Sequence, residues 1–117
     1  MNFVRILADK KNPLHLEELK KEGLEAFDLV IVDLYAPDES IFPESMDIGG
    51  QTLIRAAIKN YKSVALAFDE RSIEELVLEL NKNASMTTLE FRKEQAKKAG
   101  KFIAERTKLE AELFEKI

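Results

Sequence analysis

Two short runs of apolar residues constrain the fold of this chain more than any other feature. The run DLVIVDLY, residues 28–35, is nearly continuous in apolar and β-branched side chains, and SVALAFD, residues 63–69, repeats the pattern. Runs of this kind are typical of strands in a parallel sheet that is covered on both faces. Because parallel strands need a crossover connection, usually a helix, the two runs predict an α/β domain.

The segments that follow each run supply the expected helices. From about Gln51 to Tyr61, the apolar side chains fall on one side of a helix, and ERSIEELVLELNKN, residues 70–83, repeats this periodicity after the second run. The predicted inward residues are Leu53, Ile54, Ala57, Ile58 and Tyr61 in the first helix and Ile73, Leu76, Val77 and Leu80 in the second. Strand, helix, strand and helix in this order predict a right-handed parallel crossover unit.

The remaining segments add helices and loops. NPLHLEELKKEG, residues 12–23, predicts a short helix that starts at Asn12-Pro13 and stops at Gly23. FVRILA, residues 3–8, fits either a strand or a helical turn, and APDESIFPES, residues 36–45, reads as a loop. From Thr87 to Ile117 the spacing predicts one or two amphipathic helices, whose inward residues are Ala99, Phe102, Ile103, Leu109, Leu113 and Ile117.

Length and patterning indicate one domain with a thin sheet. A chain of 117 residues suits a single domain, with an α/β part at 1–86 and a helical tail at 87–117. Two strands are few for a stable sheet. Further strands are therefore expected from FVRILA, from a second copy of the chain or from a missing partner.

Composition excludes several classes of function. The net charge of −4 shows no nucleic-acid footprint, and no apolar run is long enough to span a bilayer. The chain has no cysteine and a single histidine, His15, so thiol nucleophiles and multi-histidine metal sites are excluded within one chain. His15 itself is expected on the surface. With no secretory leader either, a cytoplasmic location is expected.

The stretch SMDIGGQTLIRAAIKNY, residues 45–61, is the candidate site. In open parallel sheets, ligands bind outside the carboxyl ends of the strands, where Asp33 and Tyr35 fall and where the turn at Asp47 follows. Gly49 and Gly50 let backbone N–H groups approach a ligand closely. The structural alternative is that Asp47 only caps the helix and the glycines only turn the chain.

The order of these features resembles a known family. DLVIVDLY, MDIGGQTLIRAAIKNYKSVALAFD and TTLEFRK occur in sequence. Together they resemble the inosine monophosphate (IMP) cyclohydrolase domain of the bifunctional purine-biosynthesis enzyme that also carries an aminoimidazole-carboxamide-ribotide transformylase. The resemblance runs from about Ile6 to Arg92. It implies a methylglyoxal-synthase-like fold, a three-layer α/β domain with a parallel sheet, here truncated at the N-terminus and extended by a long C-terminal amphipathic helical segment.

The resemblance also implies a reaction and residues for it. In this family the carboxamide nitrogen of a formylated aminoimidazole ribotide attacks the formyl carbon and water leaves, which requires no metal and no cofactor. By similarity, the catalytic residues are Lys59, Tyr35 and Asp47, and the base-binding residues are Val32, Asp33, Ile48 and Gly49. The implied ligand is a purine nucleotide intermediate.

One geometric difficulty accompanies Lys59. In an unbroken helix from Gly50, Lys59 lies about 14 Å along the axis, beyond the reach of a lysine from its own Cα to a ligand at the helix start. Either the loop at Asp47 folds back along the helix, or Lys59 serves a site approached from the far end of the helix, for example across a subunit interface.

The chain departs from the family in ways that favour an incomplete site. The family's Ser-Thr-Gly-Gly-Thr phosphate loop and its Arg-Val-Lys-Thr-Leu-His-Pro motif do not occur in the chain, and Asp33 stands where Asn is usual. We therefore expect part of a split or shortened enzyme that works as a homodimer or with a separate N-terminal fragment. The alternative is a non-catalytic, self-associating α/β remnant of that domain.

Overall fold

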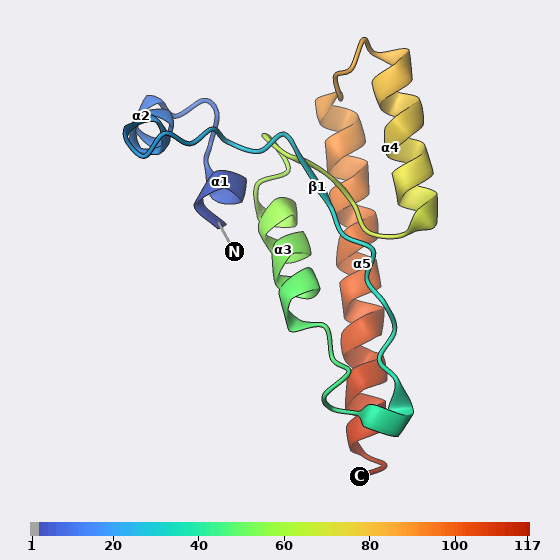
Figure 1. Ribbon diagram of the computed structural model, residues 1–117. Helices are drawn as coiled ribbons and strands as arrows, with labels where there is room; N and C mark the ends of the chain where they lie inside the picture. Colours follow the sequence, from blue (N-terminus) through green and yellow to red (C-terminus); the bar gives the residue numbers. More distant parts are fainter. Residues whose placement is uncertain (1–2) are drawn as a thin grey trace.

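A pair of short parallel strands lies among five α-helices in the computed structural model, which describes residues 3–117 (Figure 1). The elements are α1 (Phe3–Leu7), α2 (Pro13–Lys21), β1 (Leu29–Ile31), the 3₁₀ turn η1 (Glu39–Ile41), α3 (Ile48–Lys59), β2 (Ala65–Ala67), α4 (Glu70–Lys82) and α5 (Leu89–Phe114). The predicted α/β class is confirmed.

The two apolar runs form the predicted parallel pair, over fewer residues than the runs themselves. Leu29 of β1 lies opposite Ala65 of β2, and Ile31 lies opposite Ala67. Beyond the ladder, the Val32 amide still donates to the Ala67 carbonyl at 3.0 Å. The corresponding bond from Leu34 to Phe68 is long, at 3.5 Å, so the strands separate toward their carboxyl ends.

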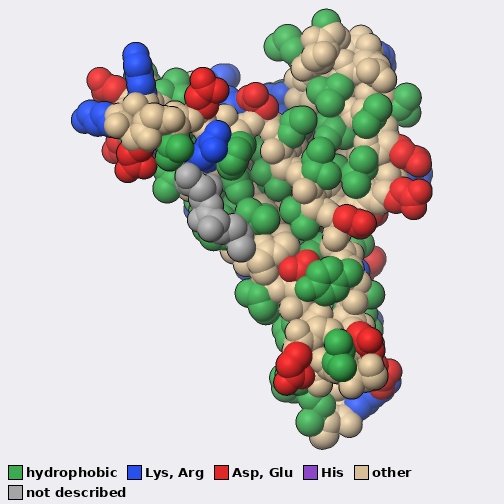
Figure 2. Space-filling model, in the orientation of Figure 1, with side chains coloured by type: hydrophobic (Ala, Val, Ile, Leu, Met, Phe, Trp, Pro, Cys, Tyr) green, Lys and Arg blue, Asp and Glu red, His purple; other side chains and the backbone are tan. Residues whose placement is uncertain are grey.

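β1 is covered on one face only. Val30 and Leu34 are 7% and 6% exposed, whereas Leu29 and Ile31, which alternate with them, are 36% and 53% exposed. Figure 2 shows hydrophobic side chains gathered over this part of the molecule, around β1 and α4. The expectation that both runs are covered on both faces is therefore wrong for β1, because no helix of residues 3–117 packs on its second face.

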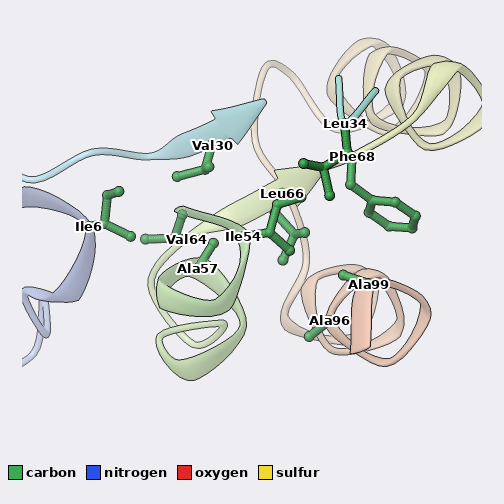
Figure 3. Packing of buried hydrophobic residues seen from close by; sticks show 10 residues of the cluster. All are labelled: Ile6, Val30, Leu34, Ile54, Ala57, Val64, Leu66, Phe68, Ala96 and Ala99. Carbon is green, nitrogen blue, oxygen red and sulfur yellow. The ribbon is translucent and has the colours of Figure 1, made fainter. Parts of the chain in front are cut away.

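β2, in contrast, lies between two layers of helix. Val64, Leu66 and Phe68 point into the main core with side chains of α3 and α5 (Figure 3), whereas Ala65 and Ala67 pack against Leu76 of α4. All five consecutive residues from 64 to 68 are 4% exposed or less. The three-layer arrangement is thus present around β2, and around β1 only two layers are present.

Most of the predicted inward side chains are buried or half-buried, but Val77 and Ile117 are exposed. α4 buries Leu76, at 1% exposed, but Val77 is 50% exposed, so its predicted inward position is wrong. The segment after Thr88 forms a single helix of 26 residues, α5, which buries Ala99 and Leu113. Ile117 lies beyond that helix and is 77% exposed, because nothing among the described residues packs there.

The N-terminal segment FVRILA, which fitted either a strand or a helical turn, is helical. FVRILA forms the helical turn α1 and adds no strand to the sheet. The Asn60 side chain, just after α3, donates to the Ile6 and Ala8 carbonyls at 2.7 and 2.8 Å. His15 is half-buried rather than freely exposed, and its Nδ1 accepts a hydrogen bond from the Asp9 amide at 3.0 Å.

α3 begins at Ile48, three residues earlier than predicted, because Asp47 caps it. The Asp47 carboxylate accepts a hydrogen bond from the Gly50 amide at 2.7 Å. Gly50 also lies against the end of β1: a Cβ at this position would meet the Asp47 carboxylate and would approach Leu34 Cδ2 to 2.7 Å. Glycine at position 50 therefore allows the helix start to pack closely against the strand end.

Replacing Asn60 is expected to loosen α1 from α3. Asn60→Ala removes the hydrogen bonds to Ile6 in α1 and to Ala8 just after it, and is expected to lower the free energy of unfolding by about 2 kcal/mol, at roughly 1 kcal/mol for each bond. Asn81→Ala, at an exposed position of α4, is the control and should stay within about 0.5 kcal/mol of the parent chain. Urea unfolding followed by circular dichroism measures both, and equal stability of the two variants would contradict this role.

Two glycine substitutions separate packing from helix propensity. Gly50→Ala is expected to lower the free energy of unfolding by about 1–2 kcal/mol, because the new methyl group displaces the Asp47 cap or Leu34. Gly100→Ala lies within α5 with no atom within 4 Å of the new Cβ, and should raise stability by about 0.5–1 kcal/mol. Thermal and urea unfolding of the two variants check the opposite signs; a stabilised Gly50→Ala would refute the close approach.

Candidate functional site

The carboxyl ends of the two strands and the start of α3 meet at one end of the sheet. Asp33 and Tyr35 follow β1, and both side chains are exposed, Tyr35 to 58%. Leu34, between them, packs beside Gly50 at the start of α3, so the chain brings the strand end and the helix start together. This is the position where open parallel sheets bind ligands.

The Asp-Ile-Gly-Gly turn caps and starts helix α3. The hydrogen bond from Gly50 to Asp47 shows that the aspartate is the N-cap of α3, as the structural interpretation of this turn requires. Ile48 is 66% exposed and Gly49 is half-buried. The first turn of α3 therefore presents backbone N–H groups and an apolar side chain close to the end of β1.

Val32 is placed differently from the other predicted base-binding residues. Its side chain is partly buried and packs against the main core cluster. Asp33, which is next to it in the strand direction, alternates to the open side and is exposed. Of the pair, Asp33 is the residue whose side chain is available at this end of the sheet.

Lys59 lies at the opposite end of α3. The helix runs without interruption from Ile48 to Lys59, and its last residue is exposed. Eleven residue steps separate the two ends by about 16 Å. Because Asp47 caps the first turn, the loop does not fold back along the helix. Within one chain, the structure does not bring Lys59 to Tyr35 and Asp47.

Arg106 of α5 is the cation that the structure does bring to Tyr35. Its guanidinium donates a hydrogen bond to the Tyr35 carbonyl at 3.0 Å and lies 5.2 Å from the centroid of the Phe102 ring. Sequence reasoning did not assign Arg106 to the site, because 71 residues separate it from Tyr35. The only local signal is the spacing of Phe102 and Arg106, which places both side chains on one face of α5.

Two shallow hollows lie along α5 at this end of the sheet. One, of about 360 Å³, extends to the residues after β2, Asp69 and Ser72, and the other, of about 200 Å³, extends to Ala36 after β1. Phe102 and Glu105 line both hollows. Pockets for small ligands commonly occupy about 300–1,000 Å³, so the larger hollow reaches only the lower part of that range.

The connector between β1 and α3 is held against the C-terminal half of α5, at the lower end of the view in Figure 1. Phe42 and Phe114 meet edge to face with ring centroids 5.2 Å apart, and the Gln51 side chain donates to Glu110 at 3.0 Å. Within the connector, hydrogen bonds from the hydroxyl and the amide of Ser40 lower the pKa of the Asp38 carboxyl. These contacts fix the path of the chain from Tyr35 to Asp47.

The described residues hold neither a metal-binding group nor a membrane-spanning helix. Between residues 3 and 117, no three side chains of the metal-binding types His, Cys, Asp and Glu form a group that could hold an ion. The helices in this part of the chain are also too short or too polar to cross a bilayer.

Several curated proteins that the chain matches have the same name. The chain is 40% identical over 90 residues to the "Bifunctional purine biosynthesis protein PurH" of Staphylococcus carnosus. It is 33% identical over 91 residues to the PurH of Ruminiclostridium cellulolyticum and 34% identical over 102 residues to that of Brucella ovis. These matches cover 69%, 70% and 80% of this chain but only 18%, 18% and 19% of the relatives. The chain thus spans less than a fifth of the length of these relatives.

A solved structure agrees with the sequence matches. The crystal structure of ForH superposes with a TM-score of 0.84 at 28% identity, and the match covers 96% of this chain and 63% of ForH. No family model matches the chain. The identities to PurH and the shared fold confirm the resemblance seen in the sequence: the chain is similar to one part of the bifunctional purine biosynthesis protein PurH, its cyclohydrolase domain.

Proposed function

We propose that the chain acts in purine biosynthesis as the base-facing half of a site that closes the second purine ring. The substrate is a formylated aminoimidazole carboxamide ribotide, and the products are inosine monophosphate and water. The observation that carries the proposal is the position of Asp33, Tyr35 and Asp47 at one end of the sheet, in a chain 33–40% identical to PurH. The activity belongs to the cyclic amide hydrolase class.

The reaction needs positioning and proton transfer at this end of the sheet. The carboxamide nitrogen forms a bond to the formyl carbon, and the formyl oxygen leaves as water with one proton from that nitrogen and one from the formamido nitrogen, which becomes doubly bonded to the former formyl carbon. The Tyr35 hydroxyl can donate to the departing oxygen, and Asp47 can orient the carboxamide. The amides in the first turn of α3, beside Gly49, favour the oxyanion character that develops on the attacked carbonyl. The chemistry itself calls for no cofactor.

Lys59 enters this proposal only through a second polypeptide. About 18 Å along the helix axis separates it from Asp47, so it acts in a site that forms at the far end of α3, against a second copy or a separate N-terminal fragment. Arg106, which is bonded to the Tyr35 carbonyl, supplies positive charge at the near end. This division of cations between the two ends of α3 explains why one chain alone holds an incomplete site.

A non-catalytic function is the second candidate. The exposed side chains of Leu29 and Ile31 on β1 favour association with another polypeptide whether or not the complex has activity. In that case the chain is a self-associating α/β module that retains the fold of the family without its reaction.

Ring closure by complementation tests the first proposal. The absorbance change on formation of inosine monophosphate is followed with the chain alone and with the chain mixed with an N-terminal fragment of Staphylococcus carnosus PurH. We expect turnover only in the mixture. No turnover in either sample would leave the non-catalytic function as the surviving one.

A matched pair of variants on α3 tests Lys59. Lys59→Ala is expected to reduce turnover of the mixture by about 100-fold or more, the usual contribution of a positioned acid or base. Arg55→Ala removes an equally exposed cation one turn earlier on the same helix, and it should change turnover by less than about threefold, as expected of a solvated surface charge. Equal effects of the two substitutions would remove Lys59 from the reaction.

A further inference from the structure

One edge of the two-stranded sheet is open. The Val32 amide donates to Ala67, and the Asp28 carbonyl accepts from Ala65, both of them across the ladder to β2. In a parallel ladder, alternate residues direct both peptide groups to the same neighbour. The N–H and C=O groups of Leu29 and Ile31 therefore point away from β2, and within residues 3–117 β1 pairs with no other strand.

An apolar surface adjoins this edge. We define the β1 surface as Leu29, Ile31 and Met86, whose side chains are 36%, 53% and 70% exposed. Leu29 and Met86 also line a hollow of about 480 Å³ together with Leu80. Hydrophobic side chains gather over β1 and α4 in Figure 2, which views this side of the molecule. An apolar surface beside unpaired strand groups marks a binding site for another chain.

The outer edge of β2 has no room for a further strand. Residues 64–68, which include β2, are almost completely buried, and α4 and α5 both pack against the strand. A further strand can therefore join only at β1. A strand added there would bring the number of strands closer to that of a typical sheet and would remove the exposed side chains of Leu29 and Ile31 from water.

The geometry favours a different polypeptide over a second copy. Two copies related by a two-fold axis would pair their β1 edges antiparallel, with both open faces on the same side of the joined sheet and still uncovered. A strand–helix unit that joins in parallel supplies the edge with hydrogen bonds and the open face with a helix. ForH fits this requirement in size, because more than a third of its chain has no counterpart in this one.

We propose that the open edge of β1 and the β1 surface bind a parallel strand and its following helix from a separate polypeptide, which corresponds to the part of ForH that this chain does not match. Asp33 lies exposed after the strand, whereas Asp28, before the strand, is paired with Lys10. Asp33 therefore favours a partner strand that carries a basic residue near its carboxyl end. The inference rests on the proposed function in one respect, the identity of the partner as the other part of the same enzyme domain.

Co-purification tests the proposal without any measurement of activity. The full chain with an affinity tag is co-expressed with the part of ForH that has no counterpart here, and the mass of the complex is measured by light scattering after gel filtration. We expect a one-to-one complex. Ile31→Pro removes an N–H group that makes no bond to any of residues 3–117, and Ile31→Lys places a charge on the β1 surface.

Both variants are expected to weaken the complex by about tenfold or more, which corresponds to the loss of an edge hydrogen bond and of apolar contact. Leu14→Lys, at a 66% exposed apolar position on α2, is the matched control and should bind as the parent chain does. Circular dichroism of each variant alone verifies that the fold is retained.

Each outcome bears on the proposal. A complex that survives both Ile31 variants, no complex with the parent chain, or a homodimer of the parent chain that Ile31→Lys disrupts would each overturn it. A complex that depends on Ile31 but shows no ring closure supports the binding surface and rejects the cyclohydrolase function. Turnover of the mixture that does not depend on Ile31 would support the cyclohydrolase function and reject the binding surface.

Discussion

The burial of β2 between two layers of helix is the contact on which the rest of this structure depends. Val64, Leu66 and Phe68 face α3 and α5, and Ala65 and Ala67 face α4, so one strand of the sheet joins every long helix. Alanine is small enough for α4 to approach closely on one face, while the larger side chains fill the core on the other. Removal of this strand would take Ala65 and Ala67 out of the cluster that buries Leu76 of α4.

The asymmetry of the sheet follows from the same arrangement. The helices that contact the sheet pack against β2 or against the inner face of β1. The side chains of Leu29 and Ile31, on the other face of β1, therefore remain exposed. The site at the carboxyl ends of the strands is asymmetric in a similar way. Tyr35, Asp47 and Arg106 lie at one end of α3, and Lys59 lies at the other. A fold that is incomplete at one edge and a site that is divided along a helix are both consistent with one part of a larger assembly.

Much of the fold could be predicted from the sequence because the signals are local. The cap at Asn12 and the stop at Gly23 lie within one turn of the residues they affect, and they define α2 as expected. The motif from Asp47 to Lys59 also identified the family correctly. The predictions for Val77 and Ile117 were wrong because their exposure depends on which neighbour a helix meets, and the periodicity of a helix does not specify that neighbour.

The sequence by itself determined the order of strands and helices, the parallel pairing, the similarity to part of PurH and the residues worth testing. The tertiary structure decided what those residues can reach. It showed that Asp47 is bonded to its own helix, that Arg106 meets Tyr35 across 71 positions of sequence, and that Lys59 lies a whole helix away. The physical reason is that hydrogen bonding and periodicity act over one or two turns, whereas the meeting of distant segments depends on how the helices pack on the sheet.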